Sequence, residues 1–334
     1  MLNSDAVSQK RVFSGIQPTG AIHLGNYLGA IKQWVASQDR FDNLFCVVDL
    51  HAITMPIDPK ALHRNSRELA AILLAAGIDL QKATLFIQSQ VPEHSELAWI
   101  LTCISTMGQL GRMTQFKAKS GAKDESVGTG LFVYPALMAA DILLYQTDCV
   151  PVGADQKQHV ELTRDLAERF NTTFGETFHV PVPVIPAVGA RVMGLDDPLK
   201  KMSKSDPSPG HALWVLDSPS DVVKKIKRAV TDSGSEVRFD EARPGLNNLL
   251  TIYKAVSGKS SEEIEAHFAG KMYGHLKVEL GEMLVEELRP LREEYARLMK
   301  DPGQLETALA KGAEQARAIA QDTMRLVKSR VGLG

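Results

Sequence analysis

"RVFSGIQPTGAIHLGNYLGA", residues 11–30, is the stretch of sequence that decides the fold. Its first six residues form a short run with a β-type composition, and a turn containing Pro18 and Gly20 follows. The amphipathic pattern that begins at Asn26 predicts a helix. A strand, a glycine-rich turn and a helix in this order are typical of the first unit of a parallel sheet, in which ligands bind at the carboxyl ends of the strands.

The same alternation continues along the first part of the chain. Apolar runs at 43–52, 83–89 and 149–153 predict further strands, and their continuous apolar character is typical of strands buried on both faces. Helical patterns at 58–79, with an Asp-Pro start and a Gly stop, and at 154–170 separate them. We therefore expect an α/β fold with a Rossmann-like, doubly wound parallel sheet.

The character of the sequence changes after the sheet region. β-type runs disappear from about residue 218, and charged helical patterns follow at 220–230, 247–258, 260–270, 273–299 and 305–330. This shift places a boundary between 195 and 218. We assign residues 1–200 to the Rossmann-like sheet domain and residues 201–334 to a loop followed by an all-helical domain.

Composition limits the class of protein. The chain has 334 residues, 44% of them hydrophobic and 23% charged, with a net charge of −2, which is ordinary for a globular protein and gives no bulk sign of a nucleic-acid partner. Cys46, Cys103 and Cys149 are widely spaced, which predicts free thiols in a reducing compartment. The sequence contains no apolar run of membrane-spanning length and no signal-peptide core, so we expect a cytoplasmic protein without a membrane partner.

The usual nucleotide and metal motifs do not occur. No GxGxxG follows a predicted strand, and the GKS at 258–260 lies in the helical half without the earlier glycine of a phosphate loop, so it predicts an interhelical turn. No closely spaced set of metal ligands is present, and we expect no metal held by the protein.

Two segments could hold phosphate. In the turn after the first strand, Gly15, Gly20 and Gly25 allow the backbone to approach a ligand, and the following helix directs its N–H groups at the same space. The second segment, "LKKMSKSDPSPG" (199–210), carries three lysines on a stretch that ends in Pro and Gly. Taken alone, the first could be an ordinary turn and the second a solvated basic loop.

Together the two segments resemble the signatures of class I aminoacyl-tRNA synthetases. "KMSKS" (201–205) matches fully, whereas "HLGN" (23–26) has Leu24 for the usual Ile and Asn26 for the usual second His. Asn26 keeps a donor for phosphate but cannot carry a proton, so we assign it no acid–base role. Further blocks in one order, among them "VVDLHAIT", "MTQFKAKS", "YPALMAADILLY" and "KKIKRAVTDS", resemble the family of bacterial tryptophanyl-tRNA synthetases over nearly the whole chain.

The resemblance implies a reaction. L-tryptophan attacks the α-phosphorus of ATP to give tryptophanyl-adenylate and pyrophosphate, and tryptophan then passes to the 3′ end of tRNA(Trp). Positioned lysines would neutralise charge on the leaving pyrophosphate, and Mg²⁺ would arrive with ATP. The implied catalytic residues are Gln17, Lys119, Lys201, Ser203 and Lys204. The implied ATP-binding residues are Gln17, Pro18, Thr19, His23, Gly25, Asn26, Gly153, Ala154, Asp155, Val192, Lys201, Met202, Ser203, Lys204 and Ser205.

A tryptophan pocket is also implied. Its residues are Phe13, Gly15, Val48, His51, Tyr134, Met138, Asp141, Val150, Val152 and Gln156. Asp141 lies among apolar residues, where it could accept the indole N–H and be left unpaired when Phe enters, or could form a structural ion pair. The resemblance assigns it the indole-binding role.

Partners follow from the same resemblance. The family uses its helical domain for the tRNA anticodon and acts as a homodimer, and basic helical faces occur at 222–230 and in the last helix. A tyrosyl-tRNA synthetase, a non-catalytic RNA-binding paralogue and another nucleotidyltransferase of the superfamily remain as alternatives.

Overall fold

The structure is a computed structural model that describes residues 9–113, 128–153, 156–184, 191–204 and 206–333. Its strands are β1 (Arg11–Ile16), β2 (Asp42–Val47), β3 (Ala83–Ile87), β4 (Cys149–Pro151) and β5 (Val182–Val184). The helices of the sheet region are α1 (Leu24–Asn26), η1 (Tyr27–Ile31), α2 (Lys32–Ser37), α3 (Asp49–Ala52), α4 (Pro59–Ala75), η2 (Gln88–Gln90), α5 (Glu93–Ile104), α6 (Met107–Gly111), α8 (Gly130–Leu143) and α9 (Lys157–Phe174). The C-terminal helices are α10 (Pro219–Arg228), α11 (Pro244–Ser257), α12 (Ser261–Phe268), α13 (Tyr273–Lys300) and α14 (Pro302–Val331).

The five strands form one parallel sheet in the order β3-β2-β1-β4-β5. The chain first builds outward from β1 through β2 to β3 and then returns to the other side of β1 with β4. The order therefore reverses between β1 and β4, and a crevice opens at the carboxyl ends of these two strands. The predicted doubly wound fold is confirmed.

Both faces of the sheet are buried by helices. On β2, Phe45 and Val47 belong to a core shared with α4 and α13, whereas Leu44 and Cys46 belong to a core shared with α5, α8 and α9. Side chains alternate between faces along a strand, so a continuous apolar run supplies both cores. This explains why the β2 region lacks the polar alternation of a half-exposed strand.

Several predicted boundaries shift. The run at 43–52 ends as a strand at Val47, and Asp49–Ala52 forms α3. Residues 88–90 are the 3₁₀ helix η2 and not an extension of β3. The edge strand β5 was not predicted, because it has only three residues, one of them a proline, which is tolerated on an edge strand.

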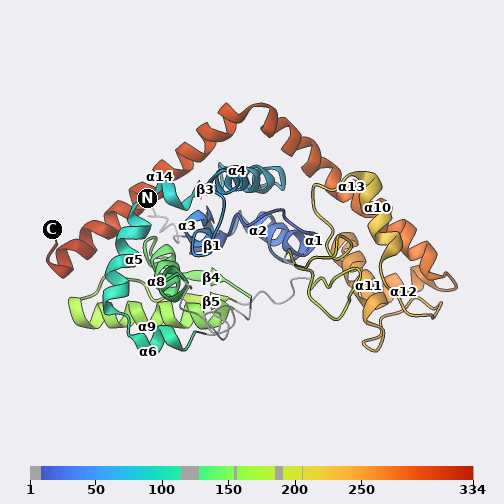
Figure 1. Ribbon diagram of the computed structural model, residues 1–334, viewed down its shortest axis with the longest axis horizontal. Coiled ribbons are helices and arrows are strands. Elements are labelled where there is room, and N and C mark those ends of the chain that lie inside the picture. The colour runs from blue at the N-terminus through green and yellow to red at the C-terminus, as the bar shows by residue number, and fades with distance from the viewer. Residues whose placement is uncertain (1–8, 114–127, 154–155, 185–190, 205, 334) are drawn as a thin grey trace, which may run out of the picture.

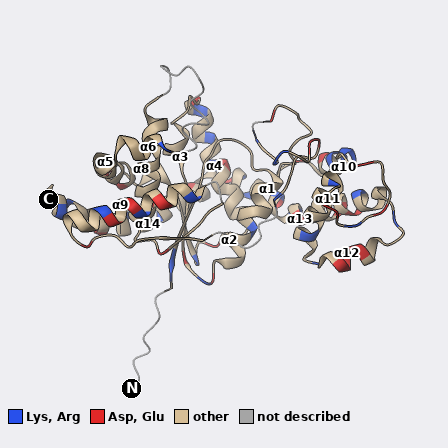
Figure 2. Cartoon of the chain, turned by 90° about the horizontal axis from the view of Figure 1, so that it is seen from below, with Lys and Arg blue, Asp and Glu red and all other residues tan. Residues whose placement is uncertain are grey.

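The helical region begins with α10, and the turn predicted at 258–260 is confirmed. Gly258 ends α11 with a φ of +69°, and the Ser260 side chain caps α12 by accepting from the N–H of Glu263. α10 to α12 lie together at one end of the molecule (Figure 1). Lys and Arg cluster on α10, whereas α12 presents Glu (Figure 2).

The last helix, α14, packs on the sheet domain and not on α10 to α12. α13 and α14 form two arms that return over the sheet domain (Figure 1), and Ala316, Ala320 and Met324 of α14 are buried in the core beside α5 and α8. A methyl group on Gly312 would come within 1.9 Å of the Leu85 carbonyl oxygen in β3, so glycine is what permits this close approach. Our expectation of a spatially separate helical unit is therefore wrong for α14, whose composition alone is that of an exposed helix.

Candidate active site

A cavity of about 410 Å³ lies at the crevice between β1 and β4. Gly15 lies in β1 and Gln17 directly follows it, Val152 and Gly153 follow β4, and α8 contributes Asp141. A Cβ on Gly15 would lie 3.0 Å from Val48, so a larger residue there would crowd the cavity wall. The doubly wound order thus places the cavity where this fold binds ligands.

All ten residues predicted for the tryptophan pocket line this cavity, although they come from five different segments. Two of the predicted ATP-binding residues, Gln17 and Gly153, line it as well. The ten are Phe13, Gly15, Val48, His51, Tyr134, Met138, Asp141, Val150, Val152 and Gln156. Their apolar surfaces surround a few polar groups, which is the usual make-up of a small-molecule site. Their ligand roles stay predictions.

Asp141 is 2% exposed and is surrounded by hydrogen-bond donors. His51 Nε2 lies 2.7 Å from its Oδ2, while Gln88 Nε2 at 2.5 Å and His94 Nδ1 at 2.7 Å approach its Oδ1. An ionised carboxylate offers about four acceptor sites, so one remains for a donor in the cavity. Our expectation that Asp141 would be left unpaired without an indole is wrong, because three protein groups already satisfy it.

The charge of Asp141 is fixed by these neighbours. Burial alone would raise the pKa of its carboxyl, but His51 and His94, through charge and hydrogen bonds, outweigh burial and hold the pKa well below its ordinary value. His94 Nε2 also lies 2.7 Å from the Tyr145 hydroxyl, which extends the network to the end of α8. The cavity therefore presents a fixed anion to any ligand.

Tyr134 faces the cavity from the first half of α8. Its hydroxyl lies 2.6 Å from His159 Nε2 of α9, and burial raises its pKa to about 12. Tyr134 is therefore a neutral hydrogen-bonding group across the physiological range, held in place by a buried histidine.

The first signature forms a second, adjacent corner. His23 caps α1: its Nδ1 accepts from the N–H of Asn26 at 3.2 Å, and Asn26 Oδ1 accepts from the His23 N–H. Burial, followed by the charges of Lys204 and Lys201, lowers the pKa of His23 to about 4. His23 is therefore neutral at pH 7, and because Nδ1 accepts a hydrogen bond, Nε2 carries the proton and can donate one.

The second signature meets this corner. Lys204 Nζ lies 3.3 Å from the carbonyl oxygen of Gly20, in the turn after β1. Burial lowers the pKa of Lys204 to about 8. Within the described part of the chain no carboxylate pairs with Lys204, and a lysine that is partly removed from water in this way is suited to bind an incoming anion. Lys201 lies at the start of the same loop, with an exposed side chain.

The other residues predicted to bind ATP differ in how deeply they are buried. Pro18 is buried and Thr19 exposed in the β1–α1 turn. Val192 and Met202 are each 1% exposed, and the Met202 N–H donates to the Val192 carbonyl at 3.1 Å. Their side chains therefore support the loop from the core, and Val192 also lies against Gly25.

Ser203 is half-buried beside Met202 in the same loop. Lys119, Ala154, Asp155 and Ser205, also predicted for the site, lie outside the described residues.

Sequence reasoning missed the groups that orient the predicted ones. Gln88, His94 and Tyr145 hold or extend the Asp141 network, and His159 holds Tyr134. All four are fully buried. A polar residue inside an apolar run, such as Gln88 directly after β3, was the available signal, because such a residue needs a buried partner.

Across the described ranges, no group of three or more His, Cys, Asp or Glu side chains is arranged to hold a metal ion. Within the same ranges, no helix combines the length and the apolar character needed to cross a membrane.

Comparison with known proteins names the family. The family described as "tRNA synthetases class I (W and Y)" matches residues 7–289. The chain belongs to this family. A curated relative of this synthetase, the tryptophan–tRNA ligase of Wolinella succinogenes, is 60% identical over 325 residues, which cover 97% of this chain and 99% of the relative.

Solved structures of class I synthetases agree with the fold. The tryptophanyl-tRNA synthetase of Mycoplasma pneumoniae has a TM-score of 0.88 and 41% identity, and covers 98% of both chains. The Campylobacter jejuni tryptophanyl-tRNA synthetase, solved in complex with ADP and tryptophan, has a TM-score of 0.85 and 38% identity, covering 97% of this chain and 100% of that chain. The α/β fold and the class I assignment expected from the sequence are confirmed.

Proposed function

We propose that this synthetase is a tryptophan–tRNA ligase, which activates L-tryptophan with ATP and transfers it to tRNA(Trp). The observation that carries the proposal is the meeting of two sites at the carboxyl ends of β1 and β4. A mainly apolar cavity with a fixed anion, Asp141, adjoins a corner with His23 and Lys204. The 60% identity to a tryptophan–tRNA ligase supports the choice of amino acid.

In the first step, tryptophan occupies the cavity and its carboxylate attacks the α-phosphorus of ATP. The new bond joins a carboxylate oxygen to this phosphorus, and the bond from the α-phosphorus to the bridging oxygen breaks, so that pyrophosphate leaves with its electron pair. The indole N–H donates to the acceptor site that remains on Asp141. Little covalent chemistry falls to the protein, which positions the reactants and stabilises the leaving group.

The phosphate corner supplies complementary donors. His23 donates from Nε2 without adding charge, and Lys204 and Lys201 add charge where pyrophosphate develops it. These groups suit phosphate oxygens and not a metal ion. Mg²⁺ bound to the phosphates would neutralise part of the triphosphate charge.

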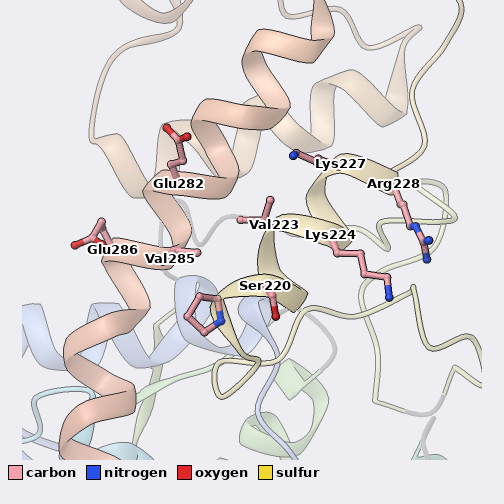
Figure 3. A pocket seen from close by; sticks show the side chains of 9 residues that line it. Ser220, Val223, Lys224, Lys227, Arg228, Glu282, Val285 and Glu286 are labelled. Carbon is pink, nitrogen blue, oxygen red and sulfur yellow. The ribbon is translucent and has the colours of Figure 1, made fainter.

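The helical region supplies a surface for tRNA. A groove of about 690 Å³ runs between α10 and α13, with Lys224, Lys227 and Arg228 on one wall and Glu282 and Glu286 on the other (Figure 3). Its centre is apolar, formed by Val223 and Val285. The cationic side chains can bind phosphate groups, and the apolar side chains beside them can contact bases. This combination suits the unpaired nucleotides of an anticodon loop. We assign the anticodon to this region.

A homodimer is part of the proposal. Trp99 is 70% exposed and Met107 is 76% exposed, and both lie on consecutive helices, α5 and α6, beside the exposed Cys103. Large exposed apolar side chains that cluster in this way mark protein contacts. Two copies that contact each other through these helices would form a dimer with two active sites.

We expect the enzyme to work in the cytoplasm, where tRNA is charged.

The decisive experiment is amino-acid-dependent exchange of pyrophosphate into ATP with each of the twenty amino acids. Exchange with tryptophan alone is expected. Exchange with tyrosine would favour a tyrosyl enzyme, and no exchange with any amino acid would favour a non-catalytic paralogue. Charging of tRNA(Trp) then tests the second step.

A further inference from the structure

His211 lies directly beneath the signature loop and has no part in the site described above. Its side chain is 1% exposed. Its Nδ1 lies 2.8 Å from Asp196 Oδ1, and its Nε2 lies 3.2 Å from the carbonyl oxygen of Lys201. The ring therefore bridges a carboxylate and the backbone of the first residue of the signature.

Both of these partners can only accept hydrogen bonds. A neutral imidazole has a single N–H, so either tautomer of His211 would turn a lone pair toward an acceptor, at Asp196 or at Lys201. Only the imidazolium form donates to both. We propose that His211 is a positioning residue that, as imidazolium, fixes the Lys201 backbone and thereby sets the place of the signature loop over the phosphate corner.

The chain is shaped around this ring. A Cβ on Gly194 would lie 2.2 Å from His211 Cε1, so a side chain at position 194 would displace the imidazole. The His211 carbonyl accepts from the Leu195 N–H at 3.0 Å, and the Gly194 N–H donates to the Lys200 carbonyl at 2.8 Å. Gly194, His211 and the start of the loop therefore form one interlocked unit.

The electrostatic surroundings favour the charged ring. Asp206 Oδ2 lies 3.8 Å from Nδ1, and the Ser208 hydroxyl donates to the other oxygen of Asp196. Burial alone would lower the pKa of His211, but the Lys201 carbonyl, Asp196 and Asp206 together raise it above its ordinary value. Among the described residues, other charged or titratable groups near this cluster are His23 across the corner, Asp197 and Lys200 from the same segment as Asp196, and, from α10, Asp221, Lys224, Lys225 and Arg228.

The sign of the pH effect follows from this. Because the folded-state pKa of His211 lies above 6.5, the loop is fully fixed below about pH 6.5 and is released as the pH rises through the folded pKa. The functional part rests on the proposed function. Release of Lys201 should slow adenylate formation, whereas tryptophan binding in the separate cavity should not change.

The first test does not depend on activity. The NMR titration of the His211 ring, assigned by comparison with a His211→Gln variant, should give a pKa above 6.5 that falls in an Asp196→Asn variant. Amide exchange at Gly194 and Met202 should be about tenfold faster in His211→Gln, because their hydrogen bonds belong to the same unit. A ring that titrates below 6.5, or unchanged exchange at both amides, overturns the proposal.

The second test uses pyrophosphate exchange between pH 6 and 9. His211→Gln should lower kcat about tenfold at pH 6 and remove one alkaline step of the wild-type profile, with the KM for tryptophan unchanged. The other step, due to Lys204, should stay. A profile identical to that of the wild type overturns the role of His211 in catalysis.

A double-mutant cycle separates the specific contact between position 194 and His211 from general misfolding of a variant. Gly194→Ala should impair exchange in the wild type, where the methyl group meets the ring at 2.2 Å and the Asp197 carbonyl oxygen at 2.9 Å, but less in His211→Ala, where only the milder contact with Asp197 remains. Simple additivity of the two changes would contradict the interlock. If the wild type shows no tryptophan-dependent exchange at any pH, the proposed function fails. The NMR titration and the amide-exchange measurements would still show whether His211 is an imidazolium that fixes the Lys201 backbone.

Discussion

Lys204 Nζ lies 3.3 Å from the carbonyl oxygen of Gly20, although the two residues are 184 positions apart in the chain. This contact brings the lysine-rich loop onto the turn after the first strand. Burial is the main cause of the lowered pKa of His23, and this contact adds to it by bringing the charges of Lys204 and Lys201 close to the ring. The phosphate corner is thus built from two segments that lie far apart in the sequence.

Replacing Lys204 by Ala should lower the kcat of pyrophosphate exchange by about 10²–10³-fold, because a charged donor to the leaving group is lost. The Kd for tryptophan should change little, since the cavity is separate. Lys200→Ala is the matched control: Lys200 is exposed and pairs with Asp197 at 3.0 Å, so exchange should stay near the wild-type rate. Equal losses of kcat in both variants would indicate that the total positive charge of the loop matters and not the position of Lys204.

The pH dependence of ATP use should report Lys204. Burial lowers its pKa to about 8, so the charged form is present below pH 8 and is lost as the pH rises through that value. We expect kcat/KM for ATP to fall above pH 8, and kcat to fall at a higher pH, because bound phosphate raises the lysine pKa. Lys204→Arg should move both falls out of the measurable range. A profile that Lys204→Arg leaves unchanged would assign the fall to another group.

Asp141 should contribute only part of the selectivity for tryptophan. Since His51, Gln88 and His94 already satisfy it, loss of the indole hydrogen bond costs one charged bond, about 1.5–3 kcal/mol, or about 10–10²-fold against phenylalanine. Asp141→Asn should reduce the ratio of kcat/KM values for tryptophan and phenylalanine by that factor. Met138→Leu, a change of shape on the same cavity wall, is the control and should alter the ratio less. A ratio unaffected by Asp141→Asn would remove Asp141 from indole recognition.

Gly312→Ala should destabilise the protein by about 1–3 kcal/mol, because the new methyl group meets the Leu85 carbonyl of β3 at 1.9 Å. Denaturant unfolding of the variant measures this. Gly274→Ala in α13 is the control, since, apart from its chain neighbours and the adjacent backbone of its own helix, no atom of the described residues lies within 4 Å of its new methyl group, and it should be neutral or slightly stabilising. Equal stability of the two variants would show that α14 can move away at little cost.

Replacing Lys224, Lys227 and Arg228 together by Ala should lower kcat/KM for tRNA and flatten its dependence on salt, while pyrophosphate exchange stays unchanged. Lys259→Ala, in the turn between α11 and α12, is the control and should keep the wild-type salt slope. A triple variant that charges tRNA with the normal salt slope would place the tRNA elsewhere.

Much of the sheet domain could be predicted, because buried parallel strands leave long apolar runs such as that of β2. β5 could not, since three residues with a proline carry no such pattern. The return of α14 was also hidden: its apolar face predicts a helix that packs against some partner, but the pattern does not say that Gly312 and Ala316 at its centre meet the sheet domain.

The residues of the site also divide into those that the sequence could predict and those that it could not. Residues within signatures or on one helix face, such as His23 or Asp141, could be proposed from the sequence. Their partners could not, because His51 and His94 reach Asp141 across 90 and 47 positions, and only folding brings them together. The pKa values of His23 and Lys204 likewise depend on the contact between two distant loops.

The position of α14 along the edge of the sheet has a consequence for how the protein is made. β3 is an edge strand, and the helix whose Gly312 approaches its backbone follows much later in the chain. While the ribosome is still synthesising the chain, that edge stays open to pairing with other nascent strands. Premature termination before α14 would therefore yield aggregation and not a smaller working enzyme.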